Sequence, residues 1–84
     1  MNEQTYDIPL GWRLRKVGAK QYLVGLNRAI ELSGAAPYFI EKFLDGLTHD
    51  QIVSDAAGDF GVATETIDRD LSSFVDYLRN AKIL

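Results

Sequence analysis

The spacing of the apolar side chains changes at Ser33, and this change divides the chain into two kinds of structure. Before Ser33 apolar and polar residues alternate, as in Trp12-Arg13-Leu14-Arg15, which is typical of a strand with one solvated face. After Ser33 the apolar residues recur at steps of three and four, which is typical of amphipathic helices. The sequence therefore predicts a sheet first and helices second.

Three short segments carry the alternating pattern. They are residues 12–17, 21–26 and 29–32. Residues 18–20 supply one turn and Asn27-Arg28 the other, and connections this short join antiparallel strands. We therefore predict a three-stranded antiparallel sheet, with Ile30 and Leu32 on one face of its third strand.

The first helix is expected to begin at Ser33, a good N-cap. Pro37 stands about one turn in, where its missing N–H is tolerated, although it favours a later start. Asp45-Gly46 ends the helix. Its apolar stripe consists of Ala36, Phe39, Ile40, Phe43 and Leu44.

Two more helices follow. Thr48 and Gln51 have the spacing of a capping box, which predicts the start of the second helix, and residues 60–62 end it. The third and longest helix opens at Ala63 or Thr64. Its apolar stripe consists of Ile67, Leu71, Phe74, Tyr77, Leu78 and Ala81.

These elements predict an α+β domain of the winged helix-turn-helix-like kind, a three-stranded antiparallel sheet followed by three helices. None of the elements can bury an apolar face alone, so the helices must pack on one side of the sheet. We assign residues 12–84 to this single domain, because 84 residues are too few for two cores. Residues 1–11 show no period of 2 or 3.6, and we predict a flexible N-terminal arm there.

Composition excludes most catalytic and metal chemistry. The chain has no cysteine and one histidine, His49, which we expect in solvent beside a helix N-cap rather than in a catalytic role. Its glycines form neither of the common nucleotide-binding patterns. We therefore predict no enzyme activity, no cofactor and no metal. The chain also lacks an apolar run of the roughly 20 residues that span a membrane, and a signal peptide, so we expect a cytoplasmic location without membrane contact.

The formal net charge of −3 hides an uneven distribution. Residues 11–30 contain five basic side chains and no acidic one, whereas residues 31–84 contain ten acidic side chains against four basic ones. The five basic residues are Arg13, Arg15, Lys16, Lys20 and Arg28. The pattern allows either a basic surface that binds an acidic partner or two halves that neutralise each other in the fold.

Residues 48–81 have the profile of a helix-turn-helix, so DNA binding is an alternative function. The segment that would enter the major groove, residues 63–70, carries one arginine against three carboxylates, and this disfavours contact with phosphates. We therefore expect no nucleic acid partner. A small acidic winged-helix regulator of DNA or protein stays the main alternative, and an adaptor without a peptide ligand is another.

The order of several stretches is distinctive. The strand region contains Trp12-Arg13-Leu14, Tyr22-Leu23-Val24 and residues 29–33, and residues 36–48 read APYFIEKFLDGLT. The third helix contains IDRDL at 67–71 and FVDYL at 74–78, and the chain closes with KIL at 82–84. In the order and spacing of these stretches, residues 12–84 resemble the PqqD-like family.

This resemblance implies a function that composition does not show. PqqD-like proteins are peptide chaperones, also called RiPP recognition elements, that bind the leader segment of a ribosomally made precursor peptide. They present it to a modifying enzyme, in many cases a radical SAM enzyme, in the biosynthesis of pyrroloquinoline quinone (PQQ) or of other products made from ribosomal peptides. The resemblance implies that the leader adds as a strand beside the third strand, in a groove between that strand and the third helix.

Carried over to this sequence, the resemblance identifies a set of peptide-binding residues. The strand edge comprises Arg28, Ala29, Ile30, Glu31 and Leu32, and the facing helix contributes Asp70, Phe74 and Tyr77. A core role for Phe74 is an equal alternative, whereas a ring with a polar tip, as in Tyr77, suits a half-exposed groove. Arg28 offers a charge to acidic residues of a peptide. An exposed strand edge also allows strand exchange between copies, so both a monomer and a dimer are compatible with the sequence.

Overall fold

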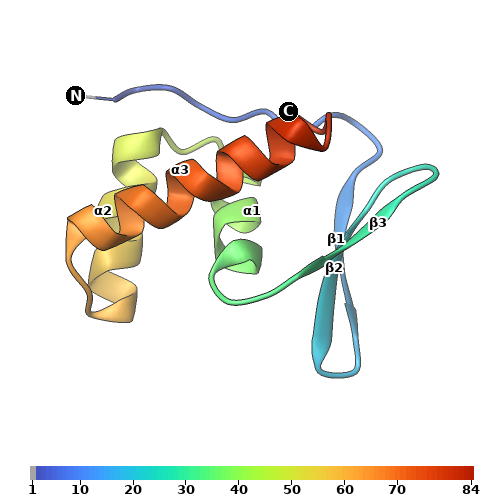
Figure 1. Cartoon of the computed structure of the whole chain (residues 1–84), viewed down its shortest axis with the longest axis horizontal. Helices are drawn as coiled ribbons and strands as arrows, with labels where there is room; N and C mark the ends of the chain where they lie inside the picture. The colour runs from blue at the N-terminus through green and yellow to red at the C-terminus, as the bar shows by residue number, and fades with distance from the viewer. Residues whose placement is uncertain (1) are drawn as a thin grey trace.

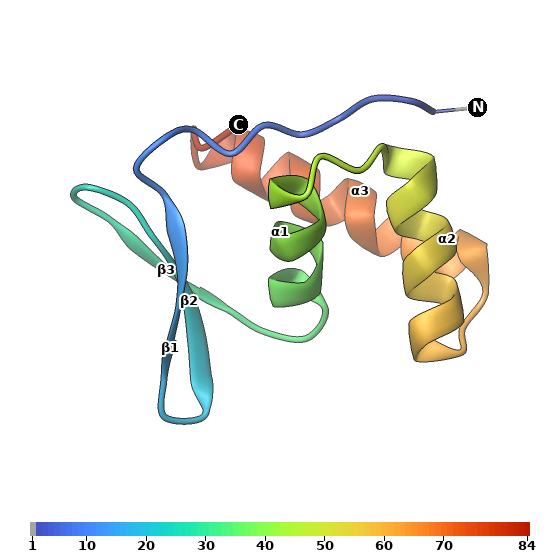
Figure 2. The same cartoon turned by 180° about the vertical axis from the view of Figure 1, so that it is seen from behind.

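The computed structural model describes residues 2–84 and confirms the predicted order of a three-stranded sheet followed by three helices (Figure 1). The strands are β1 (Arg13–Val17), β2 (Lys20–Val24) and β3 (Ala29–Leu32), and the helices are α1 (Ala36–Leu44), α2 (His49–Phe60) and α3 (Thr64–Asn80). All three helices lie on the same side of the sheet (Figure 2). The fold class is therefore α+β, and the likeness to a winged helix stays a prediction.

The sheet is antiparallel with the strand order β1-β2-β3, so β1 and β3 are its two edges. A two-residue turn, Gly18-Ala19, joins β1 to β2, and Gly18 adopts the left-handed conformation that such turns favour. The register pairs Leu23 with Leu14 on one side and with Ile30 on the other. These three side chains share the face of the sheet that packs against the helices.

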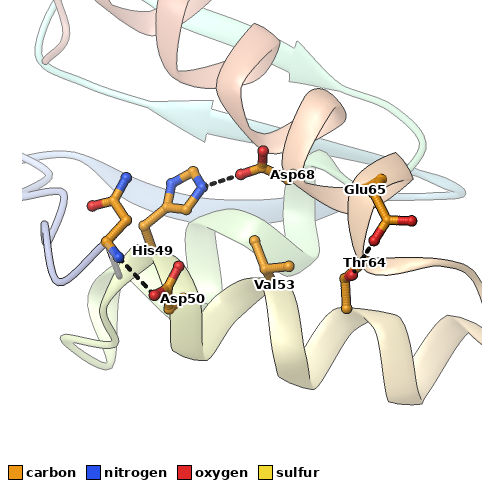
Figure 3. Close-up of a pocket in the computed structure, with 7 residues that line it drawn as sticks. His49, Asp50, Val53, Thr64, Glu65 and Asp68 are labelled. Carbon is orange, nitrogen blue, oxygen red and sulfur yellow. Dashed lines mark hydrogen bonds and ion pairs between the residues drawn. The ribbon is translucent and has the colours of Figure 1, made fainter.

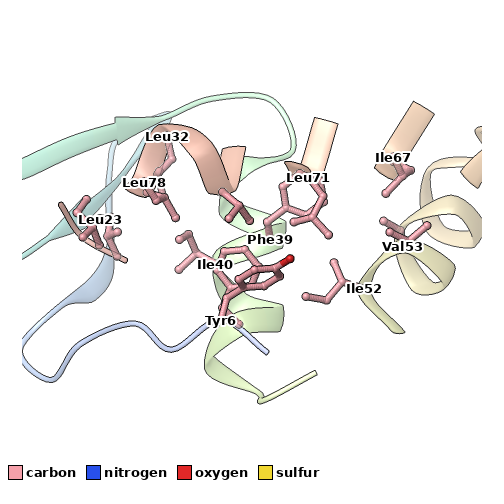
Figure 4. Packing of buried hydrophobic residues seen from close by; sticks show 14 residues of the cluster. Tyr6, Leu23, Leu32, Phe39, Ile40, Ile52, Val53, Ile67, Leu71 and Leu78 are labelled. Atoms are coloured by element: carbon pink, nitrogen blue, oxygen red, sulfur yellow. The ribbon is translucent and has the colours of Figure 1, made fainter. Parts of the chain in front are cut away.

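The hydrophobic core fills the space between that face and the helices (Figure 4). Its largest fully buried side chains are Phe39, Leu23, Ile40, Ile52, Leu71 and Leu78. On α3 the buried residues are Ile67, Leu71, Val75 and Leu78. The predicted stripe of α3 was therefore wrong in one detail: the buried line passes through Val75, and the rings of Phe74 and Tyr77 lie on its flank. Among residues 2–84, no helix combines the length and apolar character that crossing a bilayer requires.

The start of α2 agrees with the prediction, whereas α1 starts later than predicted. The capping box of α2 is confirmed, because the Thr48 hydroxyl accepts from the Gln51 amide at 3.2 Å and the Gln51 side chain accepts from the Thr48 amide at 2.9 Å. The N-cap of α1 is Ala35 rather than Ser33, and Pro37 lies in the first turn. Ser33 instead begins a turn in which its carbonyl accepts from the Ala36 amide at 3.1 Å, which delays the helix.

Part of the N-terminal segment contacts the domain, while the flexibility that we predicted for residues 1–11 stays a prediction. Tyr6 is only 6% exposed, and its ring packs against Phe43 with 5.1 Å between centroids. Thr5 forms a β-bridge with Thr48, and the His49 amide donates to the Gln4 carbonyl at 2.7 Å. Residues 2–11 form no helix or strand of their own, and these contacts with α1 and the start of α2 place residues 4–6 against the domain.

Trp12, just before β1, packs on the turn between β2 and β3. A methyl group added at Gly25 would lie 2.7 Å from the Trp12 ring, so the indole lies directly on the Gly25 backbone. Arg28 belongs to the same turn as Gly25, and its guanidinium lies 5.8 Å from the Trp12 ring centre. The Gly25 amide donates to the Arg28 carbonyl at 2.8 Å and closes the turn between β2 and β3.

Candidate functional site

The free edge of β3 is the first component of the candidate site. Hydrogen-bonded and non-hydrogen-bonded pairs alternate along an antiparallel ladder. Because Gly25 and Arg28 form a hydrogen-bonded pair, the next such pair is Leu23 with Ile30. The main-chain N–H and C=O groups of Ala29 and Glu31 therefore point away from β2, where an added strand would meet them.

Two contacts connect the residues that flank β3 with α3. At the start of β3, the Arg28 guanidinium donates to the Ala81 carbonyl at 2.6 Å, just past the end of α3. At the other end of β3, Ser33 lines a pocket together with Asp70 and Phe74 of α3. The two residues that flank β3 thus meet α3 at two levels, Arg28 just past its C-terminal end and Ser33 beside its middle.

The hollow beside α3 consists of two pockets with shared walls. One, of about 250 Å³, is lined by Ser33, Ala35, Ala36, Phe39, Asp70, Ser73 and Phe74. The other, of about 340 Å³, is lined by Gly34, Ala35, Phe60, Val62, Thr66, Ile67 and Asp70. Ala35 and Asp70 line both pockets, so the two are neighbours beside α3, and we refer to the pair as the hollow.

Aromatic rings continue this hollow toward the C-terminal end of α3. Phe74 and Tyr77 are stacked, with 6.5 Å between ring centres and planes 15° apart. Phe74 also lies 6.0 Å from the Phe39 ring and 6.1 Å from the Phe43 ring, so one side of it belongs to the core. Tyr77 is 50% exposed. Asp70, Phe74, Tyr77 and Ala81 are spaced by four, three and four residues, which places them on one face of the helix.

The predicted site residues thus fall into three groups. Ala29 and Glu31 present the free main chain of the edge, while Asp70, Phe74 and Tyr77 form one face of α3. Ile30 and Leu32 pack against the core and hold the strand in place, and a contact of theirs with the leader stays a prediction. Arg28 lies outside β3, and its guanidinium is engaged with Ala81 and Trp12, so it positions the edge against the helix.

The sequence analysis missed the side chains at the far end of the hollow. Phe60 and Val62 are 46% and 42% exposed, although both are large and apolar. We treated residues 60–62 as the end of a helix, and Gly61 does end α2 with a positive φ of 66°. The sequence carries no signal for them, because the exposure that marks this pair as a surface is seen only in the structure.

Tyr38 packs against the Phe60 end of the hollow. Its ring packs against Phe60 at 4.9 Å between centres, and its hydroxyl donates to an Asp59 carboxylate oxygen at 2.7 Å. Burial, and then this hydrogen bond to Asp59, raise the pKa of Tyr38 above its ordinary value of 10.0. The hydroxyl therefore stays protonated and keeps Phe60 in place.

A second, polar pocket of about 600 Å³ surrounds His49 (Figure 3). Here the prediction of an exposed histidine was wrong, because His49 is only 4% exposed. Its Nε2 donates to Asp68 at 2.5 Å, and its Nδ1 accepts from the Tyr6 hydroxyl at 2.7 Å. Burial raises the pKa of Tyr6. Both ring nitrogens of His49 therefore have hydrogen-bond partners within the protein.

The family model described as coenzyme PQQ synthesis protein D (PqqD) matches residues 14–84 of the chain. This stretch holds all three helices and all of the sheet except its first residue. No curated protein and no solved structure matches. The matched stretch contains every residue of the β3 edge and of the α3 face. The chain therefore belongs to the PqqD family.

Proposed function

We propose that this chain binds the leader segment of a ribosomally synthesised precursor peptide and presents it, in the cytoplasm, to a modifying enzyme of the radical SAM type. The PqqD family supports a peptide-binding role in PQQ synthesis in general and implies interaction with other proteins of that pathway. The family is one of non-catalytic accessory proteins, in agreement with a binding role rather than a catalytic one. The proposed leader adds to β3 as a further strand.

The single observation that carries this proposal is the free edge of β3 beside the hollow of α3. An extended peptide that pairs with β3 gains main-chain hydrogen bonds with Ala29 and Glu31, each worth about 0.5–1.5 kcal/mol net. These bonds do not depend on the sequence of the peptide. Its side chains on one face would reach the hollow next to Asp70 and Phe74, and this contact supplies the selectivity.

The composition of the hollow indicates which leader fits. Its walls are mostly apolar, so a pair of aliphatic or aromatic side chains at alternate positions of the leader is favoured. The Asp70 carboxylate in the middle favours a hydrogen-bond donor between them. Arg28 donates to the Ala81 carbonyl and keeps its positive charge, so its attraction to acidic leader residues stays a prediction.

An amide NMR titration tests the proposal. The labelled protein is titrated with the precursor peptide encoded beside its gene, and we expect saturable shifts at residues 28–32 and 70–77. An unperturbed spectrum at high peptide concentration, or shifts confined to residues 12–20, would contradict the proposal. Shifts of the same kind with a DNA duplex, lost on addition of salt, would favour the winged-helix regulator instead.

A matched pair of proline variants tests the added strand directly. Ala29→Pro removes a main-chain N–H that points away from the sheet, so the fold should tolerate it while leader binding weakens by about tenfold. Lys16→Pro is the control, because Val17 and Lys20 flank a two-residue turn and the Lys16 N–H therefore points away from the sheet at the opposite edge. Equal affinity of both variants for the leader would show that β3 is not the binding edge.

A further inference from the structure

The outer face of the sheet is a second surface that no helix covers. Side chains alternate along a strand, so Arg13 and Arg15 of β1 lie on the face opposite to Leu14. The register places them beside Val24 and Tyr22 of β2. The helices all lie on the other side of the sheet (Figures 1 and 2). Two arginines are thus presented on an open surface.

This face adjoins a hollow of about 520 Å³ between β1 and the turn after β2. Arg13 and Arg15 line it, together with Leu10 and Leu26. Leu26 is 94% exposed and Leu10 is fully exposed. Neither leucine contributes burial to the fold, and each lies in or next to a turn: the Trp12 amide donates to the Pro9 carbonyl at 3.3 Å, and the Gly25 amide donates to the Arg28 carbonyl.

The charges around this hollow have one sign. Residues 11–30 contain no acidic side chain. Glu31 of β3 carries a carboxylate on the same face, and Lys20, 3.9 Å away, partly neutralises it. Exposed apolar side chains beside arginines are the composition of protein–protein interfaces, where arginine is enriched and lysine depleted.

We propose that this outer face, with Arg13, Arg15, Leu10 and Leu26, docks the acidic surface of the modifying enzyme while the leader occupies the β3 edge. The inference rests on the proposed function and adds where the enzyme binds. The leader site uses the edge of β3 and α3, and the docking site uses β1, β2 and the turns beside Leu10 and Leu26. Because the two surfaces have no residue in common, peptide and enzyme can be bound at once.

Nucleic acid and lipid fit this face less well. A duplex binds through many phosphate contacts, and the carboxylates of Glu65, Asp68 and Asp70 on α3 repel phosphates from the rest of the molecule. Attraction to an anionic bilayer is worth about 1 kcal/mol per basic residue near the surface, which is weak for two arginines. An acidic protein surface with an apolar centre complements both the arginines and the leucines.

The test measures the affinity of the purified modifying enzyme encoded beside this gene for three variants. Arg15→Glu and Lys16→Glu make the same charge change at neighbouring positions whose side chains lie on opposite faces of β1. We expect Arg15→Glu to weaken enzyme binding by about tenfold, more at low salt, and Lys16→Glu to change it less than about twofold. Leu26→Ser, at an exposed position, should weaken enzyme binding and leave the urea midpoint unchanged.

The outcomes separate this inference from the proposed function. If wild-type protein fails to bind the leader peptide, the proposed function is wrong. If the leader binds and Arg15→Glu leaves enzyme affinity unchanged, or reduces it no more than Lys16→Glu does, only the docking face is wrong. Absence of enzyme binding by the wild type also overturns the inference. The inference is also wrong if the protein binds a DNA duplex or phosphatidylglycerol vesicles, and Arg15→Glu abolishes that binding while enzyme binding persists.

Discussion

The Arg28 guanidinium donates to the Ala81 carbonyl at 2.6 Å and so joins the turn before β3 to the end of α3. A cation at the C-terminal end of a helix is favoured by the partial negative charge of its free carbonyls. Arg28 also lies over the Trp12 ring. One side chain therefore links the β2–β3 hairpin, the start of β1 and the end of α3, and it sets how the β3 edge faces the helix.

Arg28→Ala should therefore weaken both the fold and the site. We expect the free energy of unfolding to fall by about 1 kcal/mol, which is typical of a hydrogen bond made by a charged group at the surface. Leader affinity should fall by more than this loss explains, because β3 is no longer held against α3. Urea denaturation and titration calorimetry measure the two effects. Arg69→Ala, on the exposed face of α3, is the control and should change neither.

Gly25→Ala should destabilise the protein through Trp12. The added Cβ would lie 2.7 Å from the indole ring, so the ring must move, at a cost of about 1–3 kcal/mol. Gly58→Ala is the matched control, because Gly58 lies inside α2 and a Cβ there meets no atom within 4 Å. Alanine in a helix is favoured over glycine by about 0.5–1 kcal/mol, so this variant should be more stable. Urea midpoints that move in the same direction would contradict the argument.

Tyr77→Ala should separate binding from stability. The side chain is half exposed, so its removal should lower the free energy of unfolding by less than about 1 kcal/mol. We expect leader affinity to fall by about tenfold, because the stacked pair of Phe74 and Tyr77 loses its outer ring. Tyr22→Ala on the outer face of the sheet is the control for leader binding. If both variants bind the leader equally, Tyr77 is not part of the groove.

Because of Tyr6 and Tyr38, we expect the folded protein to lose stability at alkaline pH. The folded state raises the pKa of both phenols above 10.0, mainly by burial. The unfolded chain therefore releases these protons at lower pH than the folded protein does, so stability is retained below pH 10 and falls as the pH rises beyond it. Urea midpoints at pH 8, 10 and 11 measure the fall.

Two variants check that the tyrosines are the cause. Tyr38→Phe removes one of the two raised groups and should make the alkaline loss of stability shallower. Tyr77→Phe changes an exposed phenol and should leave the slope of the wild type unchanged. A wild-type slope in the Tyr38→Phe variant would rule out a contribution from Tyr38.

The sequence predicted those features that depend on neighbouring residues. The Thr48–Gln51 capping box, the end of α2 at Gly61 and the three strands all follow from spacings of a few residues, and the structure confirms them. The order and spacing of longer stretches also indicated the family. The helical repeat also predicted one shared face for Asp70, Phe74 and Tyr77.

Features that depend on contacts between distant segments were not predictable in the same way. His49 is buried because Tyr6 and Asp68, 43 residues before it and 19 residues after it, take up both of its ring nitrogens. Val75 rather than Tyr77 enters the core because the rotation of α3 is set by its packing on the other helices and the sheet. The exposure of Phe60 and Val62 could not be predicted from the sequence, since a helix end has no regular pattern of burial.

The docking of Tyr6 has a consequence for the order in which the protein folds. The hairpins and helix ends close short loops, whereas Tyr6 meets Phe43 and His49 only after those residues have been brought together by α1 and α2. Residues that come first in the chain are thus expected to dock last. The amide of His49, which donates to the Gln4 carbonyl, reports on that final step.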